Sequence, residues 1–364
     1  MRTTGTSAVV SRLAAQGHLI GGTWRASHAA GTHAHHYAAT GRVQAEVGLA
    51  GPADVDDAVN AAVEAQPAWA ALSPTRRAAV LYRLADLLEV HADEAAELAA
   101  LDNGTPVSVM QPGHYTAAWV RYYAGWCDKL GGETLAGGRT ATSVRLEPYG
   151  VVAVIPPWNG SMMGMGQKAA PALAAGNAVV AKPPELAPFG VLRFAELAAE
   201  AGLPPGVLNV VVGGAGTGAA LAGHPGVDKI SFTGGGATAR ILMATAAANL
   251  TPLALELGGK SPNIVFPDAD LDRAATTACM GTALLSGQGC ALPTRLYVHD
   301  DVYDQVVARV VSTLASFTVG DPLDPATFVG PVVTEAAMER ILATVGRARS
   351  DWAELLAGGG RLGG

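Results

Sequence analysis

The spacing of hydrophobic and polar residues divides the chain into two textures. Between residues 53 and 130, apolar residues recur at helical spacing, which predicts helices over 53–70, 73–104 and 115–130. Ser73, followed by Pro74, is the expected cap of the second helix, and Asp54 is an expected cap or first-turn anion of the first. Residues 18–24 precede these helices and predict a strand that leads into a turn.

From residue 141 onward, short apolar runs alternate with helical segments. Strands are predicted within residues 143–157, 176–185, 206–214, 227–235, 251–266 (two strands around a Gly-Gly turn) and 294–300. Helices are predicted over residues 190–202, 216–226, 237–250 and 269–287. Alternating strands and helices with short connections predict an α/β fold with a parallel sheet, which binds ligands at the carboxyl ends of its strands.

Length and composition narrow the class of protein. The chain has 364 residues, which suggests about two domains, and 49% apolar with 15% charged residues suits a large α/β core. A net charge of −7 without long runs argues against nucleic acid as the main partner. No apolar run is long enough to span a bilayer, so we expect no membrane partner. The three cysteines form no CxxC pair, which fits a reducing compartment, so we expect a cytoplasmic protein.

Three histidines, His33, His35 and His36, fall close together and resemble a metal tract. No acidic or cysteine ligand stands at a fixed spacing from them. We therefore expect a surface strand or loop there, and no metal site.

Cys290 lies in "GQGCALPTR", between glycines and a proline. It follows a predicted helix C-terminus, where the helix dipole disfavours a thiolate. A base, a bound cation or a cofactor charge would have to activate it as a nucleophile.

Two further residue types fit the chemistry of a cysteine nucleophile. Glu256 stands on a predicted strand, opposite the side of its leucines, and is a candidate general base; alternatively, it faces solvent or pairs with Lys260. Asn159 follows an apolar strand in "IPPWNG", where its amide is a candidate donor to an oxyanion. Lys182 and Glu185 end another strand, and the glycines of "SFTGGG" lead from a strand into a helix N-terminus, which suits a phosphate.

Taken together, these motifs resemble the aldehyde dehydrogenase superfamily. "DVDDAVNAAVEAQPAWAAL", "LDNGTPV", "YYAGW", "PWN", "PALAAGNAVVAKPPE", "LELGGKSPNIVF" and "GQGC" occur in the family's order. The resemblance implies that Cys290 is the nucleophile, Glu256 the general base and Asn159 the oxyanion donor. It also implies a set of residues that bind NAD, or NADP: Ile155, Pro156, Trp158, Lys182, Glu185, Gly214, Phe232, Thr233, Gly234, Gly235 and Leu257.

The family's organisation implies a Rossmann-like cofactor domain in two parts, 1–131 and 150–256. Residues 132–149 would form a β-hairpin arm for oligomerisation into a homodimer or homotetramer, and 257–364 a second α/β catalytic domain. The implied reaction oxidises an aldehyde to a carboxylic acid through a thiohemiacetal and a thioester on Cys290. Glu185, close to the ribose, would favour NAD.

The chain departs from the family in several places, including Leu292-Pro293 after Cys290 and Gly235 and Ala239 in the phosphate loop, and two further departures bear on its function. Gly160, Gly164 and Gln167, with methionines between them, stand where bulky or aromatic residues are common; this predicts either a wider substrate entrance or simple helix packing. The family's acidic-x-Phe-Gly-Pro motif and final strand have no match before Gly364, so we expect a catalytic domain cut short at its C-terminal end. A non-catalytic dinucleotide-binding remnant is therefore an alternative. Transfer of the acyl group to coenzyme A is disfavoured because Glu256 is present.

Overall fold

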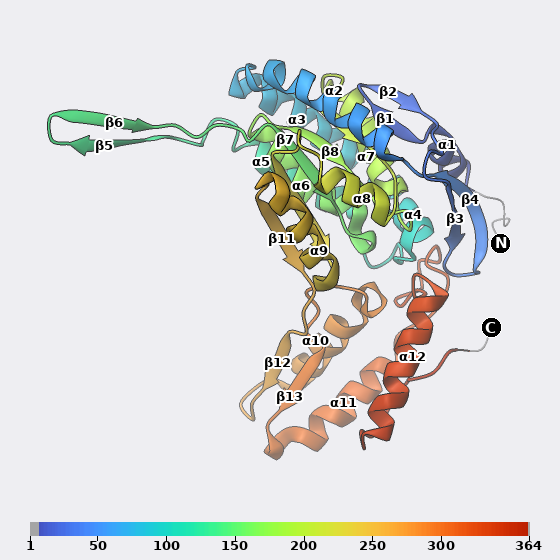
Figure 1. Cartoon of the computed structure of the whole chain (residues 1–364). Helices are drawn as coiled ribbons and strands as arrows, with labels where there is room; N and C mark the ends of the chain where they lie inside the picture. Colours follow the sequence, from blue (N-terminus) through green and yellow to red (C-terminus); the bar gives the residue numbers. More distant parts are fainter. Residues whose placement is uncertain (1–6, 363–364) are drawn as a thin grey trace. The chain divides into compact units, whose positions relative to one another are not determined.

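A computed structural model describes residues 7–362, which form two compact units (Figure 1). The first unit takes in the described residues up to His35, Val43–Leu98 and Gln111–Leu257. The second takes in His36–Arg42, Ala99–Met110 and the described residues from Gly258 onward.

The first unit is built on a seven-stranded sheet with the strand order β11-β10-β7-β8-β9-β1-β2. Its strands are β1 (His18–Ile20), β2 (Thr23–Arg25), β7 (Val151–Ile155), β8 (Ala178–Ala181), β9 (Leu208–Val210), β10 (Lys229–Gly234) and β11 (Leu253–Leu257). The five strands from β11 to β9 are parallel, and β1 and β2 extend the β9 edge in antiparallel pairing. The predicted α/β fold with a parallel sheet is thus confirmed.

Helices connect these strands and cover the sheet (Figure 1). They are α1 (Ala8–Gln16), α2 (Pro52–Ala70), α3 (Pro74–Val90), α4 (Ala92–Asn103), α5 (Pro112–Ala124), η1 (Trp158–Gly160), α6 (Ser161–Ala174), α7 (Phe189–Glu200), α8 (Ala215–Ala222), α9 (Gly236–Ala246) and η2 (Ala247–Asn249). Both predicted N-terminal signals are present. The Ser73 hydroxyl accepts from the backbone N–H of Arg76, and the Asp54 carboxylate accepts from that of Gly51 in the first turn of α2.

The single helix predicted over 73–104 is wrong, because α3 and α4 are separate helices that meet at His91. One local and two tertiary contacts hold this break. The His91 ring lies within 3.0 Å of the Glu94 carboxylate, three residues along the chain, and within 3.2 Å of the Arg193 guanidinium of α7. In addition, a Cβ on Gly113 would lie 2.6 Å from the Cα of Ala92, so α5 can approach the start of α4 only because residue 113 is glycine.

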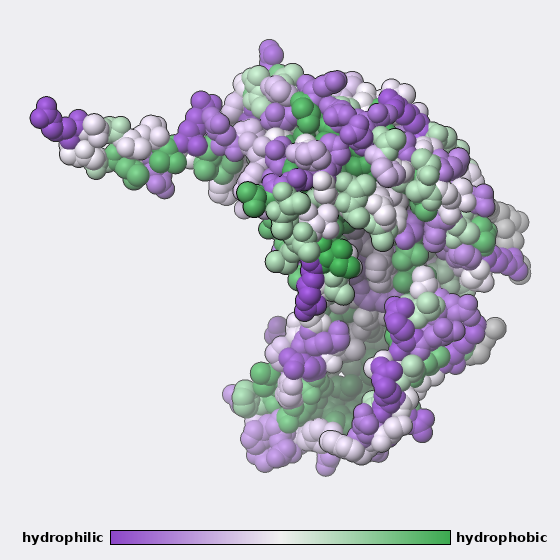
Figure 2. Space-filling view, viewed as in Figure 1, coloured by the Kyte–Doolittle hydropathy of each residue, from purple (hydrophilic) through white to green (hydrophobic). Residues whose placement is uncertain are grey.

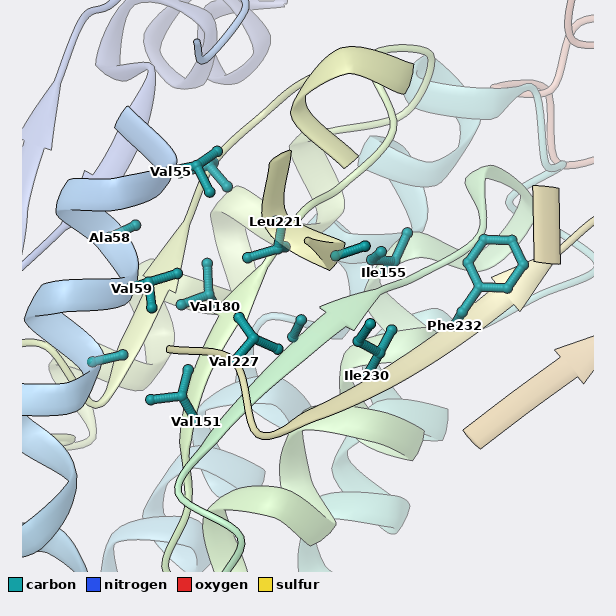
Figure 3. Packing of buried hydrophobic residues seen from close by; sticks show 14 of the residues in the cluster. Val55, Ala58, Val59, Val151, Ile155, Val180, Leu221, Val227, Ile230 and Phe232 are labelled. Carbon is teal, nitrogen blue, oxygen red and sulfur yellow. The ribbon is translucent and has the colours of Figure 1, made fainter. Parts of the chain in front are cut away.

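One hydrophobic cluster lies between one face of the sheet and helices α2, α8 and α9 (Figure 3). Alternate strand residues point to this face, among them Val151, Ile155, Ile230 and Phe232, and each is at most 6% exposed. Burial of one such side chain contributes about 1.5–3 kcal/mol, so this face anchors β7 and β10 firmly.

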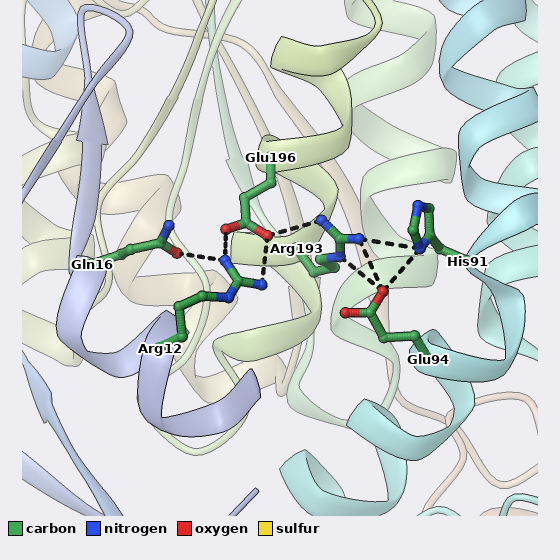
Figure 4. A network of polar contacts seen from close by, with 6 residues as sticks. All are labelled: Arg12, Gln16, His91, Glu94, Arg193 and Glu196. Atoms are coloured by element: carbon green, nitrogen blue, oxygen red, sulfur yellow. Dashed lines mark hydrogen bonds and ion pairs between the residues drawn. The ribbon is translucent and has the colours of Figure 1, made fainter. Parts of the chain in front are cut away.

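A polar network joins three helices of the first unit (Figure 4). Glu196 pairs with Arg12 of α1 and, at 3.0 Å, with Arg193 of α7, and Arg193 pairs in turn with Glu94 of α4 at 2.9 Å. Burial alone would raise the pKa of Glu196, but hydrogen bonds from Arg12 and Gln16 and the charges of both arginines lower it. The network therefore tethers α1 to α7 and α4.

Two pairs of neighbouring strands are separate from the seven-stranded sheet. β5 (Glu133–Gly137) and β6 (Thr140–Val144) form an antiparallel hairpin whose residues are all exposed, and hydrophobic and hydrophilic residues mix along it (Figure 2). β3 (Thr32–Tyr37) and β4 (Arg42–Gly48) form a second two-stranded sheet. The predicted strand at the histidine tract is present, but His35 is buried, with its ring 4.7 Å from that of Phe189.

The second unit contains the parallel strands β12 (Pro262–Val265) and β13 (Arg295–Val298). Its helices are α10 (Leu271–Ala283), η3 (Leu284–Gly287), η4 (Asp300–Val302), α11 (Tyr303–Ala315) and α12 (Glu335–Ser350). Val265, Val302 and Val306 form its buried core. Across residues 7–362, no helix is long and apolar enough to cross a bilayer, and no group of three or more His, Cys, Asp or Glu side chains is arranged to hold a metal.

Candidate active site

The carboxyl ends of β7, β10 and β11 lie side by side in the first unit. Ile155 pairs with Phe232, and Thr233 pairs with Glu256 in the adjoining ladder, while Gly234 pairs with Leu257. Parallel register therefore brings six of the predicted site residues to one edge of the sheet, where ligands bind in folds of this kind.

Glu256 belongs to the sheet face opposite the hydrophobic cluster. Leu253 and Leu255 pack against that cluster, so Glu256 points to the other face, where it is exposed. From α6, the buried Lys168 donates to the Ser231 hydroxyl at 3.3 Å. Burial lowers the pKa of Lys168, and attraction by Glu256 partly offsets that effect. Glu256 thus has a cation within electrostatic reach.

Asn159 lies in η1, the single turn between β7 and α6. Pro156 is buried and packs against α6 so closely that a Cβ on Gly164 would lie 2.8 Å from its own Cβ. This contact fixes the path of the chain between Ile155 and Asn159. Trp158 and Asn159 are themselves partly exposed, which leaves both side chains accessible to a ligand.

Lys182 and Glu185 follow β8 and meet the glycines that follow β9. The Lys182 ammonium donates to the Gly213 carbonyl at 2.6 Å, and a Cβ on Gly214 would lie 3.3 Å from a Glu185 carboxylate oxygen. Burial lowers the pKa of Lys182 to about 8, against the attraction of Glu185. Because Gly214 also caps α8, the pair lies beside a helix N-terminus.

The glycines after β10 form an open approach to α9. Gly235 is the residue before the first turn of α9, and a Cβ built on it would meet nothing within 4 Å. A Cβ on Gly234 would lie 2.4 Å from the Phe232 ring, so this position requires glycine. The free amide groups of such a helix start suit a phosphate.

Cys290 lies in the second unit, in a loop after η3. Leu285, Ser286 and Gly287 all adopt left-handed backbone, with φ of 52°, 56° and 74°, which is unusual for the first two. Two hydrogen bonds hold the loop, since the Gln288 amide donates to the Pro331 carbonyl at 3.3 Å and accepts from the Val333 N–H at 2.9 Å.

Exposure distinguishes the three cysteines. Cys290 is exposed, whereas Cys127 and Cys279 are buried, and burial raises the pKa of both buried thiols. Leu292 is buried directly under Gly289, where a Cβ would lie 2.7 Å from its Cγ. The loop therefore anchors itself through Leu292 and leaves the Cys290 thiol accessible.

The first unit contains Glu256, Asn159 and the predicted cofactor residues, while Cys290 stands in the second unit. Lys168 was missed by the sequence-based prediction. Its signal was a lone lysine in "SMMGMGQKAAPALA", a segment otherwise almost free of polar side chains. A buried lysine in such a helix needs a polar partner, and the sheet edge supplies Ser231 and Glu256.

Comparison with known proteins identifies the family. A model of the aldehyde dehydrogenase family matches residues 24–363. The phenylacetaldehyde dehydrogenase of Pseudomonas fluorescens is 42% identical over 94% of this chain, and the Bacillus subtilis (strain 168) protein named as aldehyde dehydrogenase DhaS is 41% identical over 88%. The chain spans 70% and 66% of their respective lengths.

A solved structure agrees with this result. The crystal structure of PnpE in complex with nicotinamide adenine dinucleotide superposes with a TM-score of 0.92 at 39% identity, over 95% of this chain and 72% of PnpE. The likeness confirms the predicted fold and agrees with the nicotinamide cofactor expected from the motifs. The chain therefore belongs to the aldehyde dehydrogenase family, as its ordered motifs predict.

Proposed function

We propose that the protein oxidises an aldehyde to a carboxylic acid with NAD, or with NADP as a weaker alternative. The observation that carries this proposal is the exposure of Cys290, in contrast to the two buried cysteines. Membership of the aldehyde dehydrogenase family supports the reaction class.

Three side chains take the chemical roles. The Cys290 thiolate attacks the aldehyde carbon, and the resulting oxyanion accepts a hydrogen bond from the Asn159 amide. After loss of hydride, Glu256 takes a proton from water, which attacks the thioester carbon. The carbon–sulfur bond breaks, the acid leaves, and the thiolate is restored.

Residues of the first unit would hold the dinucleotide. Lys182 and Glu185 would hold the adenosine ribose, and the open helix start at Gly234 and Gly235 would hold the pyrophosphate. When bound, NAD supplies the hydride acceptor. The Glu185 carboxylate would repel a 2′-phosphate, which favours NAD over NADP.

Assembly and location follow from other features. The exposed hairpin of β5 and β6 supports a homodimer or homotetramer in which the hairpin pairs with another subunit. Three unpaired cysteines support a cytoplasmic location.

The test is NADH formation by the wild type and by Cys290→Ala, with Cys279→Ala as a matched control. We expect Cys290→Ala to lose all activity and the control to keep it, because only an accessible thiolate can attack. Activity in Cys290→Ala would move the nucleophile elsewhere and overturn the assignment.

A further inference from the structure

Helix α6 is buried except for one narrow stripe. Within Ser161–Ala174, the residues that are not fully buried are Met163, Gln167 and Pro171, four residues apart. This interval places them on one face of the helix. Asn159 lies in η1, and the backbone of Gly160 between it and α6 is not helical (φ −166°, ψ 50°), so the stripe begins within one turn of the proposed oxyanion donor.

The start of the stripe is apolar. A Cβ on Gly160 would lie 2.7 Å from the terminal methyl of Met163, so the methionine fills the space that a side chain on residue 160 would take. A thioether adapts its shape to neighbouring apolar groups and to aromatic rings. The segment next to Asn159 therefore suits the uncharged carbon chain that follows an aldehyde group.

The far end of the stripe carries an amide and a group of aromatic rings. The Gln167 amide donates to the Tyr115 hydroxyl at 3.0 Å. The Tyr115 and Trp119 rings are 6.3 Å apart, and Trp119 stacks on Tyr123 at 5.8 Å. A Cβ on Gly166 would lie 3.1 Å from that of Trp119, so α5 holds these rings directly against α6.

Length and charge of the stripe restrict what can lie along it. Gln167 follows Asn159 by eight positions, and the helical part of that path, from Ser161 onward, is roughly 9 Å long at the rise of an α-helix. None of its side chains is charged. Lys168 turns into the sheet toward Ser231, and the nearby Arg121 of α5 is paired with Asp86 and Glu89.

We propose that this stripe, with Tyr115 and Trp119, selects uncharged aldehydes that carry an aromatic ring a few bonds from the carbonyl group. The inference rests on the proposed function and names its substrate class. The carbonyl oxygen meets Asn159, the linking carbons lie on Met163, and the ring packs on Tyr115 and Trp119. An aldehyde with a carboxylate at its far end is disfavoured, because none of the stripe's own side chains is a cation that could receive it.

The test compares kcat/KM for 3-phenylpropanal, hexanal and 6-oxohexanoate, with propanal as the reference. We expect the wild type to prefer 3-phenylpropanal to hexanal. Tyr115→Leu and Trp119→Leu should each lower kcat/KM for 3-phenylpropanal about 3- to 10-fold. Propanal, which is too short to reach the rings, should change by less than about 2-fold.

A matched control is Tyr82→Leu on α3, since Tyr82 is 41% exposed and Tyr115 is 40% exposed. Tyr82→Leu should leave kcat/KM unchanged for both 3-phenylpropanal and propanal. Gln167→Lys is a variant whose predicted effect is a gain, which poor folding cannot imitate. It should raise the use of 6-oxohexanoate relative to hexanal about 10-fold or more, since it adds a partner for the carboxylate.

These outcomes distinguish failure of the proposed substrate class from failure of the proposed aldehyde oxidation. Equal losses for propanal and 3-phenylpropanal in Tyr115→Leu, or no loss for either, would overturn the substrate class. A Gln167→Lys variant without any gain on 6-oxohexanoate would also overturn it. A wild-type enzyme that oxidises none of the four aldehydes would overturn the proposed function itself.

Discussion

Replacement of Lys182 by methionine should weaken NAD binding and remove its pH dependence. The side chain is 7% exposed, and its ammonium donates to the Gly213 carbonyl at 2.6 Å. A bound ribose would add a second hydrogen bond to the same charged group. Hydrogen bonds to charged groups contribute about 1.5–3 kcal/mol, so Lys182→Met should raise the Kd of NAD roughly 10- to 150-fold.

The pH dependence follows from the pKa of Lys182, which burial lowers to about 8. An anionic dinucleotide favours the protonated amine. With that pKa the amine is nearly all protonated at pH 7 and roughly one-tenth protonated at pH 9, so NAD affinity should fall about 10-fold over this interval. Lys182→Met should show a flat profile.

Isothermal calorimetry with NAD at pH 7, 8 and 9 measures both effects. Lys229→Met is the control, because that ammonium lies 4.6 Å above the Tyr149 ring and takes no part in the proposed site. The unfolding midpoint of Lys182→Met should change little, since loss of one hydrogen bond is offset by removal of a buried charge. An unchanged Kd in Lys182→Met, or a wild-type Kd that is constant from pH 7 to 9, would refute the reasoning.

Three further changes test other parts of the account. Glu256→Gln should slow thioester hydrolysis about 10²–10⁴-fold and produce a burst of NADH before slow turnover in stopped-flow absorbance; an unchanged steady-state rate would remove Glu256 from its role. Glu185→Gln should raise kcat/KM with NADP relative to NAD, and an unchanged ratio would place Glu185 away from the ribose. His18 is buried between the Ser27 carbonyl and the Val212 N–H, and burial lowers its pKa, so the folded state disfavours the charged ring. Urea unfolding should therefore show stability that is present above about pH 6.5 and lost as pH falls below it, and His18→Leu should weaken this loss; an equal loss in both proteins would contradict it.

The repeating strand–helix pattern was sufficient to predict the parallel sheet of the first unit. A strand such as β10 carries its own signal in the alternation of Ile230 and Phe232 with polar neighbours. The sequence contains no comparable signal for which strand pairs with which. β11 and β12 are neighbours in sequence around Gly258 and Gly259, yet β11 pairs with β10 and β12 pairs with β13.

The break at His91 shows where local patterns fail. Residues on both sides of His91 keep the helical period, so sequence alone predicts one helix. What separates α3 from α4 is largely tertiary, namely the contact of His91 with Arg193 and the close approach of Gly113 to Ala92.

The residues of the candidate site also fall into those that the sequence predicts and those whose role depends on tertiary packing. Cys290, Glu256 and Asn159 were found from residue type and motif order, and these assignments remain proposals. The role of Lys168 could not be predicted, because it depends on α6 packing over the sheet face that carries Ser231 and Glu256. Likewise, the burial of His35 depends on Phe189, which lies more than a hundred residues away in the chain.

We propose above that catalysis proceeds through an acyl group on Cys290. The most direct measurement is peptide mass spectrometry of Glu256→Gln, quenched in acid after mixing with propanal and NAD, because slow hydrolysis should let the thioester accumulate. We expect a propionyl adduct on the peptide that contains Cys290 and none on those with Cys127 or Cys279. NADH formation with an adduct on another cysteine, or with no adduct at all, would contradict it.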